Sequence, residues 1–496
     1  MYDILVIGGG INGAGIARDA AGRGLKVLLC EKDDLASHTS SASTKLIHGG
    51  LRYLEHYDFA LVRKALMERE VLLRAAPHII WPLRFVLPHH KELRPSWLIR
   101  LGLFFYDHLG GRKLLPATKT LTRKNSKVFA PLHPHFTKGF EYSDCWVEDS
   151  RLVVLNAVDA KARGATIMTQ TECIGLGPDG YGWKATLRKT DDTEMTVEAK
   201  TVVNAAGPWV DHIVGQTGAR TNTQQVRLVK GSHIIVPKMF EDERSFIFQA
   251  GDGRVIFAIP YEDGRFTLIG TTDLPFEDDL DAVKASDDEI QYLCDVSNEY
   301  FEQTISPEDV VSTYSGVRPL FDDQAKNASS VTRDYVLKLQ RNGDATMLSV
   351  IGGKITTYRK LAEDALKHLK DQFPDAQTQW TETAALPGGD IANADFEGFE
   401  TRCAGQYPWL NATMLHRLAR TYGTRLETVL GSAQSVSDLG YHYGHGLYQK
   451  EVDYLLDQEF ARSAEDILKR RTKLGLYLSP DQQTALRQNV EAQRVA

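Results

Sequence analysis

Residues 2–32, YDILVIGGGINGAGIARDAAGRGLKVLLCEK, contain in order a short apolar strand, a glycine-rich loop, an alanine-rich helix and a second strand that ends at Glu31. The loop supplies the first candidates for cofactor contact, Gly8, Gly10, Asn12 and Gly13. Glycines at this spacing let the backbone turn tightly and approach a pyrophosphate, and the helix start offers that anion free N–H groups. Glu31 is placed to accept hydrogen bonds from a ribose diol. The stretch therefore predicts a Rossmann-type dinucleotide-binding domain.

The bulk composition is that of an ordinary globular protein. The chain has 496 residues, of which 42% are hydrophobic and 25% charged, and its net charge of −7 gives no reason to expect a nucleic acid partner. The five cysteines include no C-x-x-C pair, so neither a disulfide framework nor a metal site is predicted. Neither a signal peptide nor the apolar run of about 20 residues that a membrane span needs is visible. We therefore expect a cytoplasmic protein.

A hydroxyl-rich stretch and a pair of glycines follow the dinucleotide motif. Residues 33–44 read DDLASHTSSAST, and residues 45–53 read KLIHGGLRY. The first stretch is either a flexible loop or a loop that hydrogen-bonds a ligand beside the nucleotide. The adjacent glycines of the second allow close approach of the backbone to a ligand. The cofactor-binding candidates here are Ser40, Ser41, Lys45, His48 and Gly49, and the substrate-binding candidates are Arg52 and Tyr53.

Several longer motifs resemble one family of flavoproteins. They are TSSASTKLIHGGLRYLE at 39–55, GFEYSDCWVEDSRL at 139–152, NAAGPWV at 204–210, KGSHIIVP at 230–237, TYSGVRPL at 313–320, TRDY at 332–335 and GGKITTYRKLAE at 352–363. Together with the opening motif, they make the chain similar to the FAD-dependent glycerol-3-phosphate dehydrogenases of respiring bacteria and mitochondria. The similarity extends from residue 2 to beyond residue 470.

The resemblance implies an α/β fold in which a Rossmann-type FAD-binding domain carries an inserted antiparallel-sheet substrate domain, as in D-amino-acid oxidases, followed by a helical C-terminal domain. It also implies oxidation of sn-glycerol 3-phosphate to dihydroxyacetone phosphate by hydride transfer to non-covalently bound FAD. The electrons then pass to quinone at the inner face of the cell membrane, where the protein is peripherally associated. An oxidase that uses O₂ and a non-catalytic flavin-binding protein of the membrane surface stay open as alternatives, and so does a homodimer.

Oxidising a phosphorylated alcohol requires a proton acceptor and a clamp for the anion. His233 lies inside a strand-like run, where a lone histidine is more often structural, and only the resemblance makes it the candidate general base. Arg318 is the candidate that binds the substrate anion and stabilises the developing alkoxide. The remaining substrate-binding candidates are Arg52, Tyr53, Arg333 and Lys354. The resemblance implies that Gly207 lies near the pyrophosphate of the cofactor. It also implies that a second strand–glycine–helix turn, with Gly353 and Thr356, faces the pyrimidine end of the flavin.

The predicted domains are discontinuous. We assign residues 1–80, 140–215 and 335–378 to FAD binding, 81–139 and 216–334 to the substrate domain, 379–394 to a linker and 395–496 to the helical domain. Residues 84–127 hold ten Lys or Arg against two acidic residues and surround the apolar run WLIRLGLFFY at 97–106. Such a helix suits an anionic bilayer surface, while the alternative is a buried helix with a solvated basic rim. The resemblance favours membrane contact.

Overall fold

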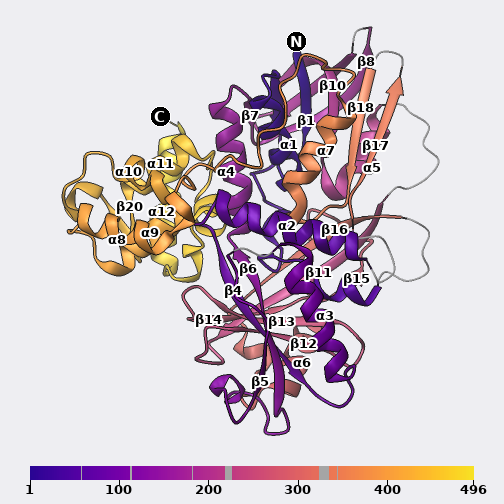
Figure 1. Cartoon of the computed structure of the whole chain (residues 1–496). Helices are drawn as coiled ribbons and strands as arrows, with labels where there is room; N and C mark the ends of the chain where they lie inside the picture. Colours follow the sequence, from indigo (N-terminus) through magenta and orange to yellow (C-terminus); the bar gives the residue numbers. More distant parts are fainter. Residues whose placement is uncertain are drawn as a thin grey trace.

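Two β-sheets and a group of C-terminal helices make up the chain (Figure 1). The structure, a computed structural model, describes residues 1–56, 58–111, 114–180, 182–217, 226–322, 334–342 and 345–495. The N-terminus begins the first sheet, the second sheet lies below it in Figure 1, and the C-terminal helices lie to one side of both. The predicted α/β architecture with a helical C-terminal part is confirmed.

The first sheet is built around β1 (Tyr2–Ile7), the strand that opens the glycine motif. Its strand order is β17-β18-β10-β1-β2-β7, with β2, β7, β10 and β18 parallel to their neighbours and β17 antiparallel at the edge. These strands are β2 (Val27–Cys30), β7 (Thr166–Met168), β10 (Glu194–Asn204), β17 (Val336–Asn342) and β18 (Ala345–Ile351). Parallel strands are buried on both faces, which explains their continuous apolar runs.

Alternate residues of β1 point to opposite faces of this sheet. Ile4 and Val6 pack against a layer of helices, and Leu5 and Ile7 pack against a hairpin on the other side. The helices are α1 (Ile11–Gly22), α4 (Asp149–Ala162) and α7 (Tyr358–His368), and the hairpin is β8 (Thr171–Asp179) with β9 (Gly182–Lys189), next to α5 (Val210–Gln216). This layering holds the glycine loop at the carboxyl end of β1.

The second sheet has ten strands and is mainly antiparallel. Its order is β15-β11-β14-β13-β12-β4-β6-β3, with β16 added to β11 and β5 to β6. The strands are β3 (Leu46–Ile47), β4 (Ile80–His89), β5 (Lys119–Thr122), β6 (Lys138–Val147), β11 (Val226–Pro237), β12 (Ser245–Gln249), β13 (Val255–Tyr261), β14 (Phe266–Gly270), β15 (Leu274–Pro275) and β16 (Ser312–Phe321).

Helices cover both faces of the second sheet. Ile234 and Val236 pack in one core with α6 (Asp287–Tyr300), whereas Ile235 packs in another with α2 (Phe59–Ala75) and α3 (Ser96–Leu109). Since side chains alternate along a strand, His233 of β11 shares the face of Ile235.

Two predicted domain assignments are wrong. We assigned residues 1–80 to the FAD-binding domain, but β3 (Leu46–Ile47) and Ile80 of β4 pair with β6 in the second sheet. Residues 140–147, which we assigned to the FAD-binding domain, belong to β6 of the second sheet. β6 pairs with β4 along ten residues, from Ile80 opposite Val147 to His89 opposite Lys138. This long antiparallel ladder cannot be divided between two domains, so the chain returns to the first sheet only after residue 147.

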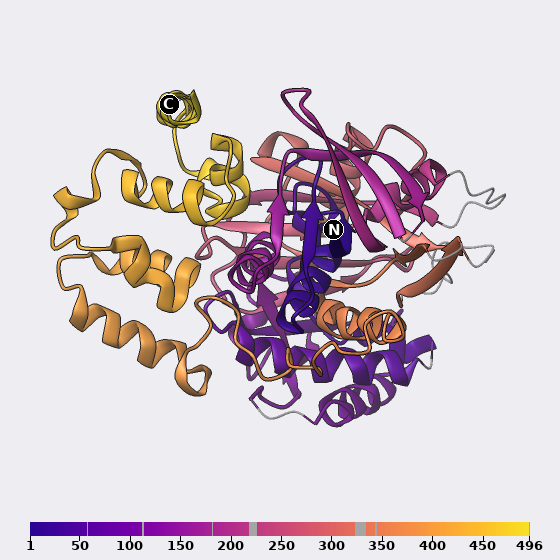
Figure 2. The same cartoon turned by 90° about the horizontal axis from the view of Figure 1, so that it is seen from above.

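The C-terminal part has a core of its own, which includes Leu418, Val452 and Leu455. It consists of α8 (Phe396–Gln406), α9 (Ala412–Tyr422), α10 (Leu426–Leu430), α11 (Gln449–Gln458), α12 (Pro480–Val495) and the short strands β19 (His442–Gly444) and β20 (Leu447–Tyr448). Figure 2 shows these helices as a separate group beside the first sheet. A buried ion pair between Arg151 of α4 and Glu459 joins the two parts.

Candidate active site

The glycine loop makes a tight turn at the start of α1, with Gly8 and Gly13 in close contact. A Cβ atom on Gly13 would lie 1.9 Å from the carbonyl oxygen of Gly8, so only glycine fits there. The backbone N–H of Ile11, at the first turn of α1, donates a 3.0 Å hydrogen bond to Oγ of Ser40. The hydroxyl-rich loop therefore lies directly against the helix N-terminus, where an anion binds most favourably.

Glu31 closes one side of the same cavity. Its carboxylate accepts hydrogen bonds from the backbone N–H groups of Gly9 at 2.6 Å and Asp33 at 2.9 Å. Burial raises the pKa of this carboxyl above its usual range, although the two N–H donors oppose the effect. The arrangement holds the carboxylate rigidly in the position that the sequence predicted for a ribose partner.

The cavity beside the glycine loop is lined by many of the residues predicted to contact the cofactor. It encloses about 1040 Å³ of space, open solvent at its mouth included, and its lining contains the predicted Gly8, Gly10, Asn12, Glu31, Ser40, Gly207 and Gly353. Nδ2 of Asn12 donates to the carbonyl oxygen of Gly352 at 3.1 Å, while its buried Oδ1 has no hydrogen-bond partner within the described part of the chain. A buried acceptor without a donor is costly, so Asn12 indicates a ligand that donates to it.

Four other predicted cofactor contacts have protein partners. Nζ of Lys45 is buried and bonds both carboxylate oxygens of Asp149, at 2.8 and 2.9 Å. Ser41 donates to the carbonyl oxygen of His38 at 3.1 Å. The backbone N–H of His48 donates to Oγ1 of Thr356 at 3.2 Å, and that of Gly49 to the hydroxyl of Tyr106 at 2.8 Å. These contacts fix the course of the loop and bring the predicted Thr356 beside His48.

His233 and Arg318 lie on one face of the second sheet. β11 and β16 pair so that His233 is opposite Tyr314 and Val229 is opposite Arg318. The His233 ring stacks on Tyr314 with 4.7 Å between centroids, and its Nε2 is 2.9 Å from Oγ1 of Thr44. A Cβ on Gly270 would lie 2.1 Å from the imidazole Cδ2. The ring is therefore held between three neighbours, and its buried Nδ1 has no hydrogen-bond partner among the residues described.

The electrostatics keep His233 neutral. Burial is the main cause that lowers its pKa well below the ordinary value, and the positive charges of Arg318 and Lys45 lower it further. Arg318 donates to Oδ1 of Asp273 at 3.0 Å and to Oγ1 of Thr271 at 3.2 Å. A neutral imidazole can accept a proton at neutral pH, and an oriented guanidinium can bind an anion beside it.

A second cationic group lies at the junction of the two sheets. Nζ of Lys354 is 3.7 Å from the ring centroid of Tyr53. Burial, followed by the charges of Lys354 and Arg69, lowers the pKa of His48 to about 4. The His48 ring approaches Phe257 of β13, which is opposite Gly270 in the sheet that carries His233. Arg52 is exposed, and Arg333 lies outside the described residues.

Sequence reasoning missed Thr44, Tyr314, Thr271 and Asp273. Tyr314 and Arg318 are four residues apart in a strand and therefore share a face, so alternation within TYSGVRPL was the signal that could have found Tyr314. The contact of Thr44 with His233 joins positions 189 residues apart, and no local pattern indicates it.

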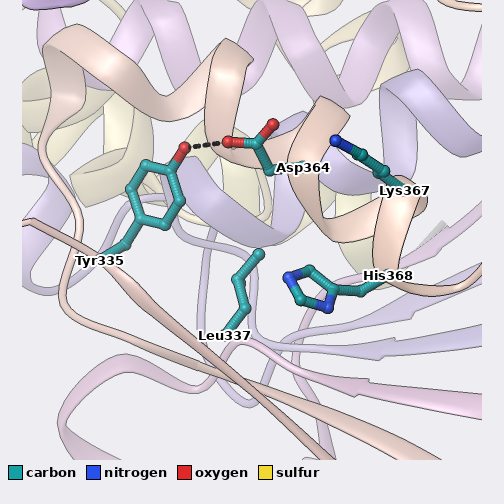
Figure 3. Close-up of a pocket in the computed structure, with 5 residues that line it drawn as sticks. All are labelled: Tyr335, Leu337, Asp364, Lys367 and His368. Carbon is teal, nitrogen blue, oxygen red and sulfur yellow. Dashed lines mark hydrogen bonds between the residues drawn. The ribbon is translucent and has the colours of Figure 1, made fainter.

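A second hollow lies between β17 and α7 (Figure 3). Its lining consists of Tyr335, Leu337, Asp364, Lys367 and His368, and it shares no residue with the dinucleotide cavity. The hydroxyl of Tyr335 donates to Asp364 at 2.5 Å and accepts from Nζ of Lys64 at 2.5 Å. Since Tyr335 and Asp364 already bind one another and the lining contains none of the predicted site residues, we assign no catalytic role to this hollow.

Two family models match the chain. The model described as FAD dependent oxidoreductase covers residues 3–359, and the one described as the C-terminal domain of alpha-glycerophosphate oxidase covers residues 379–492. The second match begins at the first residue of the predicted linker.

Full-length relatives point the same way. The chain is 54% identical over 484 residues to D-erythritol 1-phosphate dehydrogenase of Brucella abortus, covering 97% of this chain and 96% of that one. It is 51% identical over 494 residues to a glycerol-3-phosphate dehydrogenase of Pseudomonas aeruginosa, covering 99% and 96%. The crystal structure of the glycerol-3-phosphate dehydrogenase of Bacillus halodurans with FAD superposes with a TM-score of 0.76, at 26% identity, covering 100% of this chain and 94% of the other.

Proposed function

Because the chain belongs to the family of FAD-dependent oxidoreductases, we propose that it oxidises sn-glycerol 3-phosphate to dihydroxyacetone phosphate and passes the electrons to membrane quinone. The observation that carries this proposal is the placement of a neutral histidine, His233, and an oriented arginine, Arg318, on one face of the second sheet. This face lies beside the hydroxyl-rich loop of residues 33–44. The family resemblance noted in the sequence is confirmed, and FAD is the cofactor.

The described residues fit FAD without a covalent link. Glu31 would accept from a ribose, and the Gly8–Gly13 loop with the start of α1 would hold the pyrophosphate. Asn12 and Gly353 lie beside each other in the same lining. When bound, FAD supplies the acceptor for the hydride that leaves the substrate carbon.

The protein's own residues perform the remaining tasks. His233 takes the hydroxyl proton, because its imidazole is neutral and held in place by Thr44 and Tyr314. Arg318 offers a planar fork of N–H donors, oriented by Asp273 and Thr271, to the phosphate or to the oxygen that loses its proton. Lys354 and Tyr53 supply a second cation and a hydroxyl at the sheet junction.

When glycerol 3-phosphate is added to the purified protein under anaerobic conditions, we expect the flavin absorption band at about 450 nm to bleach. The band should return faster with a soluble quinone than with O₂. An unchanged band would contradict the proposed substrate and favour a non-catalytic flavin protein. A faster return with O₂ would instead indicate an oxidase.

D-Erythritol 1-phosphate is a second candidate substrate. The relative that is 54% identical over 97% of this chain carries that name. Both compounds place a hydroxyl group near a phosphate, so the same base and clamp serve either. Parallel reductive titrations with the two compounds decide between them, because the true substrate must give the larger ratio of reduction rate to half-saturating concentration.

The helix α3 provides the surface for membrane contact in this proposal. Its outer side carries Trp97, Leu101, Phe104 and Phe105, which are 67%, 43%, 49% and 42% exposed. Its inner side packs Leu103 and Tyr106 in the protein core, and Arg94 and Arg100 are exposed nearby. None of the helices in the described ranges has the length and apolar character to cross a bilayer. Figure 1 shows α3 at the periphery, where a lipid surface can reach it.

Replacing Trp97 and Phe104 together with serine is expected to weaken binding to phosphatidylglycerol vesicles by about tenfold, because two aromatic side chains no longer enter the lipid. Cosedimentation with vesicles measures the effect. Tyr441→Ser is the matched control, since Tyr441 is 61% exposed but belongs to the C-terminal part. Equal vesicle binding by the double variant and the control would refute the assignment of α3.

A further inference from the structure

We propose that the C-terminal helices hold the loop of residues 31–45 in place through Asp34, so that Asp34, Arg470 and Arg471 are positioning residues for FAD. We call residues 31–45 the cofactor loop. The proposal concerns FAD binding and holds for either substrate.

The cofactor loop contacts each part of the active site. Glu31 begins it and lines the cavity, and Ser40 accepts from Ile11 at the start of α1. Oγ1 of Thr39 donates to the carbonyl oxygen of Val317 in β16 at 2.7 Å, and Thr44 contacts His233. A displacement of this loop would therefore alter the ribose site, the helix N-terminus and the base together.

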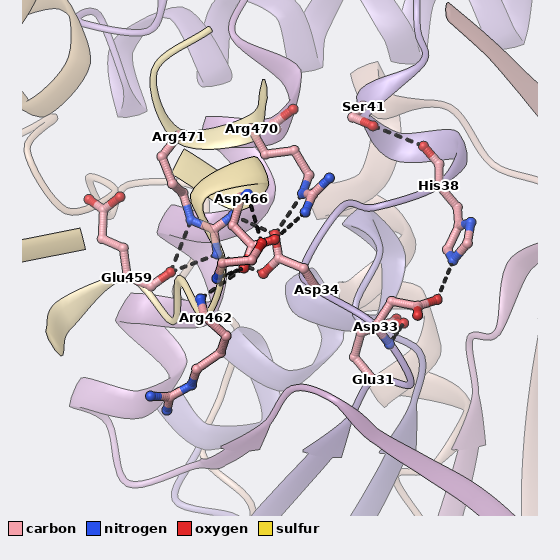
Figure 4. Close-up of polar contacts among 12 residues, drawn as sticks. Glu31, Asp33, Asp34, His38, Ser41, Glu459, Arg462, Asp466, Arg470 and Arg471 are labelled. Carbon is pink, nitrogen blue, oxygen red and sulfur yellow. Dashed lines mark hydrogen bonds and ion pairs between the residues drawn. The ribbon is translucent and has the colours of Figure 1, made fainter. Parts of the chain in front are cut away.

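Asp34 ties this loop to the C-terminal part (Figure 4). Nη1 and Nη2 of Arg471 bond its two carboxylate oxygens, each at 2.7 Å, and Nε of Arg470 bonds one of them at 2.6 Å. The side chain of Arg471 is 0% exposed and that of Asp34 is 6% exposed. Arg471 and Asp34 therefore form a bidentate salt bridge shielded from water, which is the strongest geometry that a carboxylate and an arginine can form.

The two arginines are themselves fixed. Arg471 donates to the carbonyl oxygen of Glu459 through Nε at 3.0 Å and Nη2 at 2.9 Å, and Arg470 is paired with Asp466. They end the π-helical turn η11 (Asp466–Arg471), whose first residue accepts from the backbone N–H of Ser463 at 2.9 Å. Contacts within the C-terminal part therefore orient this clamp of two arginines toward Asp34.

The charges make the clamp stiff. Burial alone would raise the pKa of Asp34, but Arg471 and Arg470 outweigh it and hold the pKa below the usual range. Moving the loop would leave a buried carboxylate and a buried guanidinium without partners, which is strongly unfavourable. The first residues after Glu31 therefore cannot shift while the C-terminal part is docked.

The test compares FAD affinity in holoenzyme variants. Asp34→Asn is expected to raise the dissociation constant for FAD by about tenfold or more, measured by flavin fluorescence during dilution. Asp34→Glu keeps the charge and should recover part of the affinity. Glu451→Gln is the matched control, since it breaks the buried pair with Arg417 inside the C-terminal part and leaves Asp34, Arg470 and Arg471 unchanged. Its FAD affinity should stay within about twofold of the wild type.

Two results would overturn the proposal. One is unchanged FAD affinity in a folded Asp34→Asn protein, and the other is an equal loss in Asp34→Asn and Glu451→Gln, which would indicate a general loss of stability in the C-terminal part. If Asp34→Asn does not fold, Arg470→Gln takes its place, because Arg470 is 15% exposed and leaves Arg471 on the carboxylate. We expect its FAD affinity to fall about threefold, and an unchanged value would equally reject the clamp.

Discussion

His233→Ala is expected to lower the rate of flavin reduction by about 10²–10⁴-fold, the contribution expected of a positioned base. The substrate hydroxyl would then lose its proposed proton acceptor, while the groups around Arg318 are untouched. Stopped-flow reduction at saturating substrate measures the change. Reduction near the wild-type rate would show that another group takes the proton.

His78→Ala is the control for this variant. His78 is also fully buried, and burial with the charges of Arg151 and Arg420 lowers its pKa to about 3. It packs against Gly388 and Gly423, and it is not one of the residues that contact His233 or Arg318 in the described structure. We expect the control to lose some stability and to keep its rate of flavin reduction.

The pH profile offers an independent check on the base. A histidine whose pKa is lowered stays neutral until the pH falls well below 6.5, so the acid limb of kcat/KM should lie below 6.5. An acid limb at or above 6.5 would mean that the site does not depress the histidine in this way.

Arg318→Ala is expected to lower kcat/KM by about 10²–10³-fold and to weaken substrate binding, because the proposed pair of charge-assisted hydrogen bonds to the substrate would be lost. Its partner Asp273 is then left without this cation, which adds to the effect. Arg318→Lys should recover only part of the loss, since a lysine cannot donate two parallel bonds. Steady-state kinetics combined with substrate titration of the flavin spectrum separates binding from reduction.

A second arginine of the same sheet is the control for Arg318. Arg254, at the start of β13, is paired with Asp252 at 3.6 Å near the surface. Arg254→Ala should leave kcat/KM within about twofold of the wild type. Unchanged substrate affinity in Arg318→Ala would contradict the clamp.

Local patterns predicted the parts of the fold that depend on neighbours in the sequence. The glycine spacing predicted the β1–α1–β2 unit, because a Cβ on Gly13 would meet the carbonyl of Gly8 and a Cβ on Gly9 would meet Glu31 immediately after β2. The membership of β6 in the second sheet was not predictable, since it depends on pairing with β4, more than fifty residues away. The alternation of apolar and polar residues along a strand of the second sheet is similar whichever neighbouring strand it pairs with.

The candidate site shows the same division. The motifs led to His233, Arg318 and Lys354, whose locations are now known, while their roles stay predictions. The contacts that orient them join distant segments, such as Lys45 with Asp149 and Asp34 with Arg471, and these lie 104 and 437 residues apart. Side-chain pairs of this kind are decided by the packing of whole elements, and no periodicity records them.

The interleaved order of the first sheet has a consequence for synthesis. β1 pairs with β10, nearly two hundred residues later, and β10 pairs with β18, which ends at Ile351. At about 5–20 residues per second, the ribosome needs tens of seconds to deliver β18 after β1 has emerged. During that time the sheet is incomplete, so β1 and β10 expose strand edges that have no partner. Unpaired edges of this kind can pair with strands of other chains. We expect the newborn polypeptide to depend on holding chaperones, and mutations that slow completion of this sheet to reduce yield before they affect the finished enzyme.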